Sequence, residues 1–325
     1  MFPPECRRFR TFAVVKIRYL PHTKIDKTAW NKAVDTAANG QIYAYSWYLD
    51  CMAENWDALI CENYAYIMPL PWNGKWAGVR QIYQPPFTQQ LGVFGKEKPS
   101  AEIIRLFLEA IPSSFRYVRL QMNEANRDIA APKFSVQSKR NMLLDLSQDY
   151  ETIYKNYRSS LRRRIRKAES ALEFAVDKVT PQELVQIYKT ELNDKIGYTE
   201  EDYERAERLM QLSAQQEKSS IYSVHFSDGR FAAGLYAPRS HGRIVQLFGP
   251  SSAEGKAVYA FHFLLHSIFK KYAGQNLIFD FEGSEIPPVY EFFRGFRPDE
   301  TSYPVIVKDD FPLWIKAAKA IREKL

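Results

Sequence analysis

The chain of 325 residues is 46% hydrophobic and 14% aromatic, which excludes wholesale disorder, and its length predicts two domains. The formal net charge of +7 favours phosphates or acidic surfaces as partners without identifying one. The cysteines Cys6, Cys51 and Cys61 lack metal-ligand spacing and suit a reducing compartment. Apolar runs are far shorter than a membrane span, and Lys16 and Arg18 interrupt any signal-peptide core, so we expect a cytoplasmic protein.

Hydrophobic periodicity and turn residues organise the first half of the chain. In chain order they predict a strand at 13–19, helices at 26–38 and 42–52, strands at 56–61, 65–70 and 79–84, a helix at 100–111, and strands at 117–121 and 142–146. Asp26 can cap the first helix. Pro85 and Pro86 interrupt the ladder after the third strand of the meander, because proline has no N–H to donate.

The second half repeats this order of elements. The prediction is a helix at 150–171, a strand at 173–176, helices at 181–194 and 200–216, strands at 221–226, 231–237 and 244–248, a helix at 256–272, and a strand at 277–281. A tail at 304–325 adds a strand at 305–307 and a helix at 312–324, which we expect to pack on the first half. The chain is therefore predicted to be α/β with mixed sheets, divided near Ser147 into domains 1–147 and 148–303.

A small-residue turn precedes the apolar helix predicted at 256–272. The first N–H groups of a helix have no internal partners and the helix dipole leaves that end partly positive, so a phosphate can approach there. The candidate donor or phosphate-binding residues are Ser251, Ser252, Glu254, Gly255 and Lys256. An ordinary loop in which Ser or Glu caps a core helix would use the same residue types.

Two carboxylates end the strand predicted at 277–281. Side chains alternate along a strand, so Asp280 and Glu282 point to one face while Phe279 and Phe281 point to the other. A carboxylate can take the proton of an attacking amine, and we predict Asp280 and Glu282 to be catalytic, with Glu285 nearby. The alternative is a structural role, in which one of them caps the next turn or pairs with Arg294.

A basic stripe marks the helix predicted at 150–171. Arg158, Arg162 and Arg166 recur at a spacing of four, and Arg163, Arg164 and Lys167 surround them. This stripe could follow RNA or precursor phosphates, or it could be a solvated helix face.

Tyrosine and glutamine side chains of the first half offer hydrogen bonds to an acceptor substrate. The candidates are Tyr45, Tyr83, Gln84 and Gln90. The alternative is packing in an aromatic core. His262 and His266 stand four residues apart but have no third ligand at a suitable spacing, so we predict packing rather than a metal site.

The order of elements resembles the tandem acyltransferase fold of the Fem family, in which two GNAT-like domains lie side by side. The resemblance is carried by NYRSSLRRRIRKAE, GPSSAEGK and FDFEGSEIPPVYEFFRGF, and the segments YAYSWYLD, MPLPW and YQPPFTQQLG are similar to short bacterial members without a coiled-coil insertion. The chain departs from the Fem pattern in two places. Glu282-Gly283-Ser284-Glu285 replaces a glycine-rich segment, and Arg294 is the single counterpart of a basic pair.

This resemblance implies an acyltransferase in which an amine attacks the donor directly, without a metal. The donor would be an acyl-CoA such as acetyl-CoA, or an aminoacyl-tRNA, and Arg294 would help to hold its phosphates. The acceptor would carry an amine, as a cell-wall precursor does, and a Fem-type peptidoglycan-precursor ligase is one alternative. A non-catalytic binding module on the same fold is the other.

Overall fold

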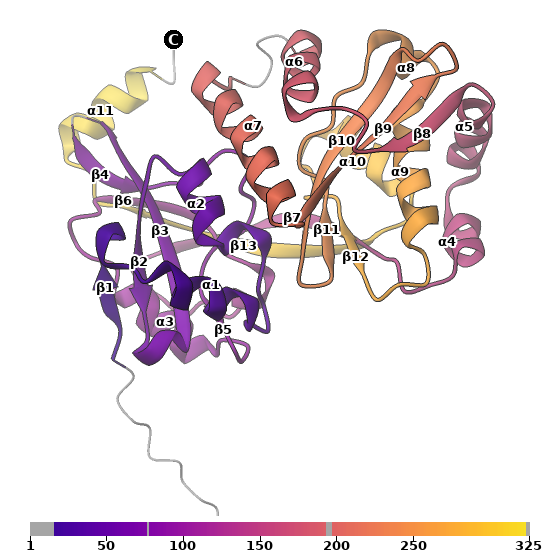
Figure 1. Cartoon of the computed structure of the whole chain (residues 1–325). Helices are drawn as coiled ribbons and strands as arrows, with labels where there is room; N and C mark the ends of the chain where they lie inside the picture. The colour runs from indigo at the N-terminus through magenta and orange to yellow at the C-terminus, as the bar shows by residue number, and fades with distance from the viewer. Residues whose placement is uncertain (1–15, 77, 193–196, 323–325) are drawn as a thin grey trace, which may run out of the picture.

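The computed structural model describes residues 16–76, 78–192 and 197–322 (Figure 1). Within these residues thirteen strands form one mixed sheet in the order β1-β2-β3-β4-β6-β13-β7-β12-β11-β10-β9-β8, with β5 paired to β3. The fold class is therefore confirmed as mixed α/β. No helix in the described part of the chain is long and apolar enough to cross a bilayer.

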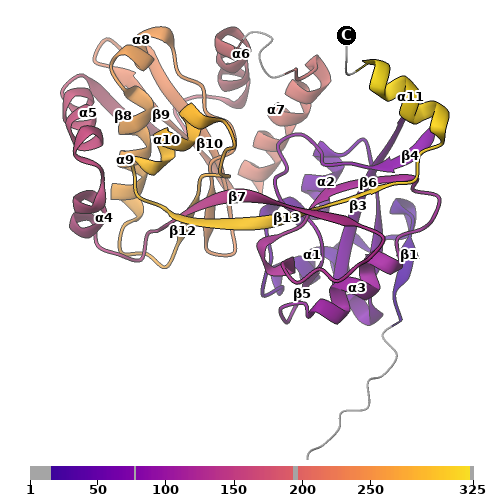
Figure 2. The same ribbon diagram turned by 180° about the vertical axis from the view of Figure 1, so that it is seen from behind.

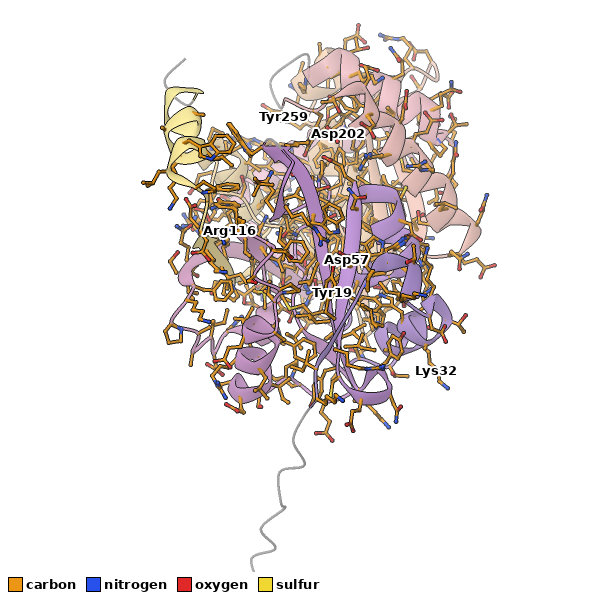
Figure 3. All side chains as sticks on the ribbon, turned by 90° about the vertical axis from the view of Figure 1, so that its left-hand side faces the viewer. Tyr19, Lys32, Asp57, Arg116, Asp202 and Tyr259 are labelled. Carbon is orange, nitrogen blue, oxygen red and sulfur yellow. The ribbon has the colours of Figure 1, made fainter. Side chains whose placement is uncertain are left out.

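The first half contains β1 (Arg18–Leu20), α1 (Lys27–Asp35), α2 (Ser46–Met52), β2 (Asn55–Ile60), β3 (Tyr66–Trp76), β4 (Val79–Ile82), β5 (Phe94–Gly95), α3 (Ala101–Glu109), β6 (Tyr117–Gln121) and β7 (Ser135–Asp145). The Asp26 carboxylate accepts the N–H groups of Thr28 and Ala29 and caps α1, as predicted. Much of the strand predicted at 13–19 lies outside the described residues. At the edge of the sheet the Tyr19 hydroxyl donates to Asp57 (2.6 Å; Figure 3).

The second half contains α4 (Tyr150–Asn156), α5 (Ser159–Glu169), β8 (Leu172–Val176), α6 (Pro181–Leu192), α7 (Glu200–Gln215), β9 (Ser219–Phe226), β10 (Phe231–Ser240), β11 (Arg243–Val245), α8 (Ala253–Ala257), α9 (Ala260–Tyr272), β12 (Ile278–Asp280), α10 (Pro287–Arg294), β13 (Asp299–Asp309) and α11 (Leu313–Arg322). The helix α10, which begins with two prolines, was not predicted.

Two predicted helices are wrong in their continuity. The helix expected at 150–171 is divided, because Tyr157 and Arg158 have extended backbone angles between α4 and α5. The helix expected at 256–272 is divided at Tyr259, which lies in the left-handed region (φ 63°).

The strand expected at 244–248 ends at Val245, since the chain then leaves β12 and bonds to β10 through Tyr236 and Phe248. Hydrophobic periodicity continues across all three interruptions, so it could not reveal them.

The strands β7 and β13 join the two halves (Figure 2). They pair antiparallel along nearly their full lengths, β7 also pairs with β12, and β13 also pairs with β6. Each half contains one parallel strand pair, β4 with β6 and β11 with β12. The helix α7 packs on α2 beside this seam (Figure 1), and Arg205 donates to the carbonyl of Met52 (3.2 Å). The interface between the halves is therefore built from main-chain pairing as well as from packed helices.

The short helix α8 lies directly against β10. A Cβ built on Gly255 would lie 2.0 Å from the carbonyl oxygen of Ala232, which is backbone and cannot move aside. At Gly74 an added Cβ would meet ordinary van der Waals neighbours, the nearest at 3.4 Å.

We therefore expect Gly255→Ala to lower the free energy of unfolding by about 3 kcal/mol, the upper end of the usual cost of overpacking. Gly74→Ala is the matched control and should change it little. Urea unfolding of the two variants measures the difference, and equal stabilities would contradict the close packing of α8 on β10.

Candidate active site

The parallel ladder between β11 and β12 stops abruptly. The Gln246 N–H donates to the Asp280 carbonyl (2.8 Å), so the next ladder bond would join the Glu282 N–H to the Gln246 carbonyl. The Glu282 N–H instead donates to Oδ1 of Asp280 (2.8 Å), and Glu282 turns the chain with a positive φ of 58°. The two strands therefore separate at this point, and the Gln246 carbonyl does not receive the ladder bond from Glu282.

The Glu282 carboxyl lies at the opening between the strands and is partly buried. The Tyr43 hydroxyl donates to its Oε1, and the Gln89 side chain donates to the main-chain carbonyl of Glu282. Burial raises the pKa of Glu282 to about 8, against the hydrogen bond from Tyr43, and the negative charge of Asp280 raises it further. A carboxyl with this pKa can accept and return a proton near neutral pH.

The raised pKa of Glu282 also has a consequence for stability. The folded chain favours the protonated carboxyl, so this group's contribution to stability is complete below pH 4.5. The contribution is lost as the pH rises from there through about 8. Above neutral pH the ionised Glu282 carboxyl therefore lowers the free energy of unfolding, as is common for groups with a functional role.

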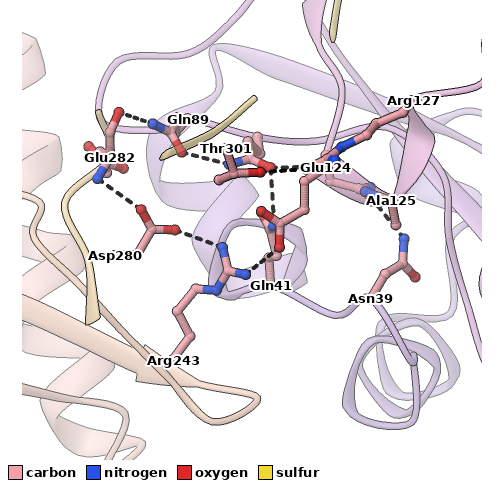
Figure 4. Close-up of polar contacts among 12 residues, drawn as sticks. Asn39, Gln41, Gln89, Glu124, Ala125, Arg127, Arg243, Asp280, Glu282 and Thr301 are labelled. Atoms are coloured by element: carbon pink, nitrogen blue, oxygen red, sulfur yellow. Dashed lines mark hydrogen bonds and ion pairs between the residues drawn. The ribbon is translucent and has the colours of Figure 1, made fainter. Parts of the chain in front are cut away.

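The Asp280 carboxylate is buried and paired. Arg243 donates to its Oδ2 (2.7 Å), and the same guanidinium donates to Oε1 of Glu124 (2.5 Å; Figure 4). Burial raises the pKa of Asp280, while the positive charge of Arg243 lowers it. The predicted alternative of a pair with Arg294 is wrong, since Arg294 lies on α10 and pairs with Glu291 (2.9 Å).

Hydrogen bonds continue from Glu124 into the first half of the chain. The Glu124 N–H donates to Oε1 of Gln90 (2.9 Å), which also accepts from Gln41 (3.3 Å). The Gln90 amide donates to Gln89 (2.7 Å), whose own amide reaches Glu282. The cluster closes on itself across the two halves (Figure 4). Neither half alone can form this site.

Two cavities flank the cluster and share Arg127 and Thr301. The first, of about 510 Å³, is lined by Ala38, Asn39, Gly40, Gln41, Lys98, Asn123, Glu124, Ala125, Arg127, Leu143, His241, Arg243 and Thr301. The second, of about 470 Å³, is lined by Arg127, Ser138, Lys139, Arg140, Glu285, Glu300, Thr301 and Ser302. Both are mostly polar, and residues of both halves line the first. The first offers room for a substrate beside Gln41, Glu124 and Arg243 of the cluster, whereas Glu282 itself lines neither of these two cavities.

The residues of the predicted donor turn lie at the start of α8. The Ser252 hydroxyl accepts the Gly255 N–H (3.0 Å) and so caps the helix itself. Glu254 pairs with Arg230, and Lys256 pairs with Glu191 (2.7 Å). Ser251 forms an isolated bridge with Ala233 of β10. A phosphate here would have to use the N–H groups of Ala253 and Glu254 or displace the Ser252 hydroxyl.

Of the predicted acceptor residues, Gln90 belongs to the cluster around Glu282. Tyr45 donates to Oδ1 of Asp35 (2.5 Å) instead. The Tyr83 hydroxyl accepts the Glu54 N–H (2.9 Å), and burial raises the pKa of Tyr83 to about 12.

Gln84 bonds the carbonyl of Thr88 (2.7 Å) and the N–H of Gln121 (2.9 Å). Like Tyr83, it makes contacts within the first half, whereas the Tyr45 hydroxyl also accepts from Lys218 of the second half (3.2 Å).

The basic stripe divides into engaged and exposed residues. Arg158 pairs with Glu291 (3.0 Å), and Arg162 donates to the carbonyls of Lys155 and Tyr157, which closes the end of α4. Arg166 is exposed on α5, as is its neighbour Arg163.

His262 and His266 are held in their neutral form. Burial lowers the pKa of each to about 4, with Arg164 and Lys270 as the second causes. In the part of the chain that the structure describes, no group of three or more His, Cys, Asp or Glu residues could hold a metal ion.

Sequence analysis missed Arg243, Glu124 and Tyr43. Their residue types are unremarkable in the sequence, and their partners are distant along the chain. One signal was available for Arg243. Parallel pairing of the two late strands puts Val245 opposite Asp280, and Arg243 then lies two residues before Val245 on the neighbouring strand.

A comparison with protein-family models matches residues 155–290 to the acetyltransferase (GNAT) domain. Among solved structures the chain is similar to FemX, with a TM-score of 0.65 and 10% identity over 91% of this chain and 98% of that one. A conserved protein from Bacteroides thetaiotaomicron has a TM-score of 0.56, 10% identity and coverages of 90% and 99%. A tandem GNAT protein from the clavulanic acid biosynthesis pathway has a TM-score of 0.52, 10% identity and coverages of 91% and 99%.

The protein therefore has the fold of the tandem GNAT proteins, and residues 155–290 match the model of the GNAT domain. The resemblance to the Fem and tandem GNAT architecture is confirmed over about 90% of the chain. At these identities the structural likeness establishes the fold alone. A search of curated proteins found no match.

The pairing of Arg243 with two carboxylates makes a direct prediction. Arg243→Met removes the cation between Asp280 and Glu124 and leaves buried carboxylates without it, so it should lower the free energy of unfolding by about 3–5 kcal/mol. Arg105→Met, which breaks the exposed pairs with Glu102 and Glu109, is the control and should change stability little. Chemical denaturation of both variants at neutral pH is the measurement. A similar small effect for both would show that Arg243 does not hold the two halves.

Proposed function

We propose that the protein is an N-acyltransferase in which an amine attacks the acyl donor directly and Glu282 accepts the amine proton. The observation that carries this proposal is the Glu282 carboxyl, whose pKa is raised to about 8, at the point where β11 and β12 separate. Its fold-level support is the GNAT domain matched at residues 155–290.

In the proposed reaction the amine nitrogen bonds to the acyl carbon, and the bond from that carbon to the carrier breaks. The amine proton passes to the Glu282 carboxylate and from there to the departing carrier, so that the carboxylate is restored. In this proposal the Gln246 carbonyl, which does not receive the ladder bond from Glu282, accepts an N–H from the bound substrate. Proton transfer of this kind contributes roughly 10²–10⁴-fold to a rate.

Asp280 has a positioning role in this proposal. Its carboxylate holds the Glu282 N–H (2.8 Å) and is itself fixed by Arg243, so the turn that presents Glu282 is held from both halves. We assign the acceptor to the first half, residues 1–147, and the donor to residues 148–303. The acceptor carries an amine, a cell-wall precursor being one candidate, and we propose that the reaction takes place in the cytoplasm.

The donor is proposed to be an acyl-CoA such as acetyl-CoA, held at Ser251–Lys256. Aminoacyl-tRNA is a second candidate, favoured by the exposed cations of α5. Arg163, Arg164, Arg166 and Lys167 are all exposed on this helix, which gives four positive charges within five residues. Phosphate binding by such a cluster would be strongly dependent on salt.

The proposal makes a test of Glu282 possible. Glu282→Gln should lower kcat by about 10²-fold or more while changing the KM for the acceptor little, because the amide keeps the shape but cannot accept the proton. The wild-type kcat/KM should rise with pH and level off above about pH 8, and this step should disappear in the variant. Acyl transfer from acetyl-CoA and from a charged tRNA to a panel of amines is the assay.

Glu109→Gln is the matched control, since Glu109 is an exposed glutamate on α3 that pairs with Arg105 (2.7 Å) and lines neither cavity. It should leave kcat and the pH profile unchanged. If Glu282→Gln keeps the wild-type rate and profile, Glu282 is not the base. If neither donor is consumed with any amine, the fold would serve as a binding module.

The two donors are separated by a charge reversal. Arg163→Glu with Arg166→Glu should weaken tRNA binding and make its dependence on salt less steep by about two charges, if RNA follows α5. Binding of acetyl-CoA should be unchanged. A filter-binding titration at several salt concentrations measures the slope, and a slope equal to that of the wild type would remove the RNA donor.

A further inference from the structure

The helix α11 presents an apolar stripe to solvent. Leu313 is 84% exposed and Trp314 59% exposed, whereas the adjacent Ile315 is fully buried. Ala317 and Ala318, one turn further on, are also exposed. These four outward residues recur at the spacing of one helical face, so the helix has one apolar side on the protein and a second apolar side uncovered.

The inner side anchors the helix firmly. Ile315 and Phe311 are buried, and the Phe311 ring stacks on Tyr117 of β6 with their centroids 5.1 Å apart. Lys316 donates to the Asp309 carbonyl (3.0 Å) at the end of β13. The exposure of Leu313 and Trp314 is therefore imposed by a packed helix and is not the result of an unpacked segment.

The charges around this stripe are mainly positive. Within α11 the sequence has Lys316, Lys319 and Arg322 and no acidic residue. At its base Asp309 and Asp310 are matched by Lys316 and by Lys308 (2.7 Å). The exposed Arg116, which lies near α11 in Figure 3, adds a third positive charge against these two negative charges. A basic helix with tryptophan and leucine on its apolar face is typical of a segment that lies in the headgroup region of a membrane.

We propose that α11 binds the surface of an anionic lipid bilayer, with Leu313 and Trp314 inserted among the headgroups and the net positive charge of the helix attracted to the lipid phosphates. The stripe has four side chains, whereas a stable protein interface takes roughly 20–30 residues from each partner. A bilayer needs no such number, because each apolar side chain gains by itself on entering the lipid and each cation near the surface adds to the attraction. The binding is reversible and holds the protein at a membrane without a spanning segment.

The experiment is co-sedimentation of the full chain with vesicles of phosphatidylglycerol and phosphatidylethanolamine, and with vesicles of phosphatidylcholine. Wild-type protein should partition onto the anionic vesicles at least about tenfold more strongly at low salt, and salt should reduce this preference. Leu313→Ser with Trp314→Ser should lower partitioning about tenfold or more, since two side chains lose their transfer from water.

Ile286→Ser is the matched control, because Ile286 is also a highly exposed apolar residue (62%) but lies at the start of α10. It should bind vesicles as the wild type does. All three proteins should have the same melting temperature, since the altered side chains are exposed.

The proposal is overturned if wild-type protein shows no preference for anionic vesicles, or if the double variant binds them equally well. It is also overturned if sedimentation velocity without lipid detects a dimer that the double variant abolishes, because a second copy of the chain would then cover the stripe.

Discussion

The guanidinium of Arg243 lies between two carboxylates that come from opposite halves of the molecule, Asp280 at 2.7 Å and Glu124 at 2.5 Å. Its positive charge keeps buried carboxylates compatible with the interior, where an unpaired charge would be costly. With Arg243 in place, Asp280 can use its second oxygen to accept the Glu282 N–H, which ends the parallel ladder and turns the chain. Burial of the Glu282 carboxyl is the main cause of its raised pKa, and the negative charge of Asp280 raises the pKa further.

This cluster needs the two halves to be held in fixed positions, and the continuous sheet holds them. The strands β7 and β13 pair with each other and with strands of both halves, so main-chain hydrogen bonds fix the halves in register. Gln89 and Tyr43 from the first half can then contact Glu282 reproducibly. A site assembled across a flexible hinge would lose the distances on which proton transfer depends.

The sequence predicted the fold and the importance of the late strand well, but its assignments around the site were uneven. Alternation placed Asp280 and Glu282 on one face, yet it could not show that Asp280 pairs with Arg243 while Glu282 accepts from Tyr43, because these partners are distant along the chain. Tyr45 was predicted where Tyr43 contacts Glu282, since two tyrosines at adjacent alternate positions look equivalent without the packing of the halves. The aromatic and amide residues Tyr83 and Gln84 hold their own half together for the same reason.

By itself, the sequence determined the class of fold, the duplicated order of elements and the cap on α1, because these depend on periodicity and on neighbours within a few residues. The tertiary structure alone decided where α8 and α9 separate, which carboxylate Arg243 holds, and that Glu282 turns away from the ladder. These features depend on contacts between residues up to 239 positions apart, such as Tyr43 and Glu282, and local patterns contain no record of such contacts. The ionisation of Glu282 belongs to the second group, because a pKa is a property of the surroundings of a carboxyl rather than of the residue itself.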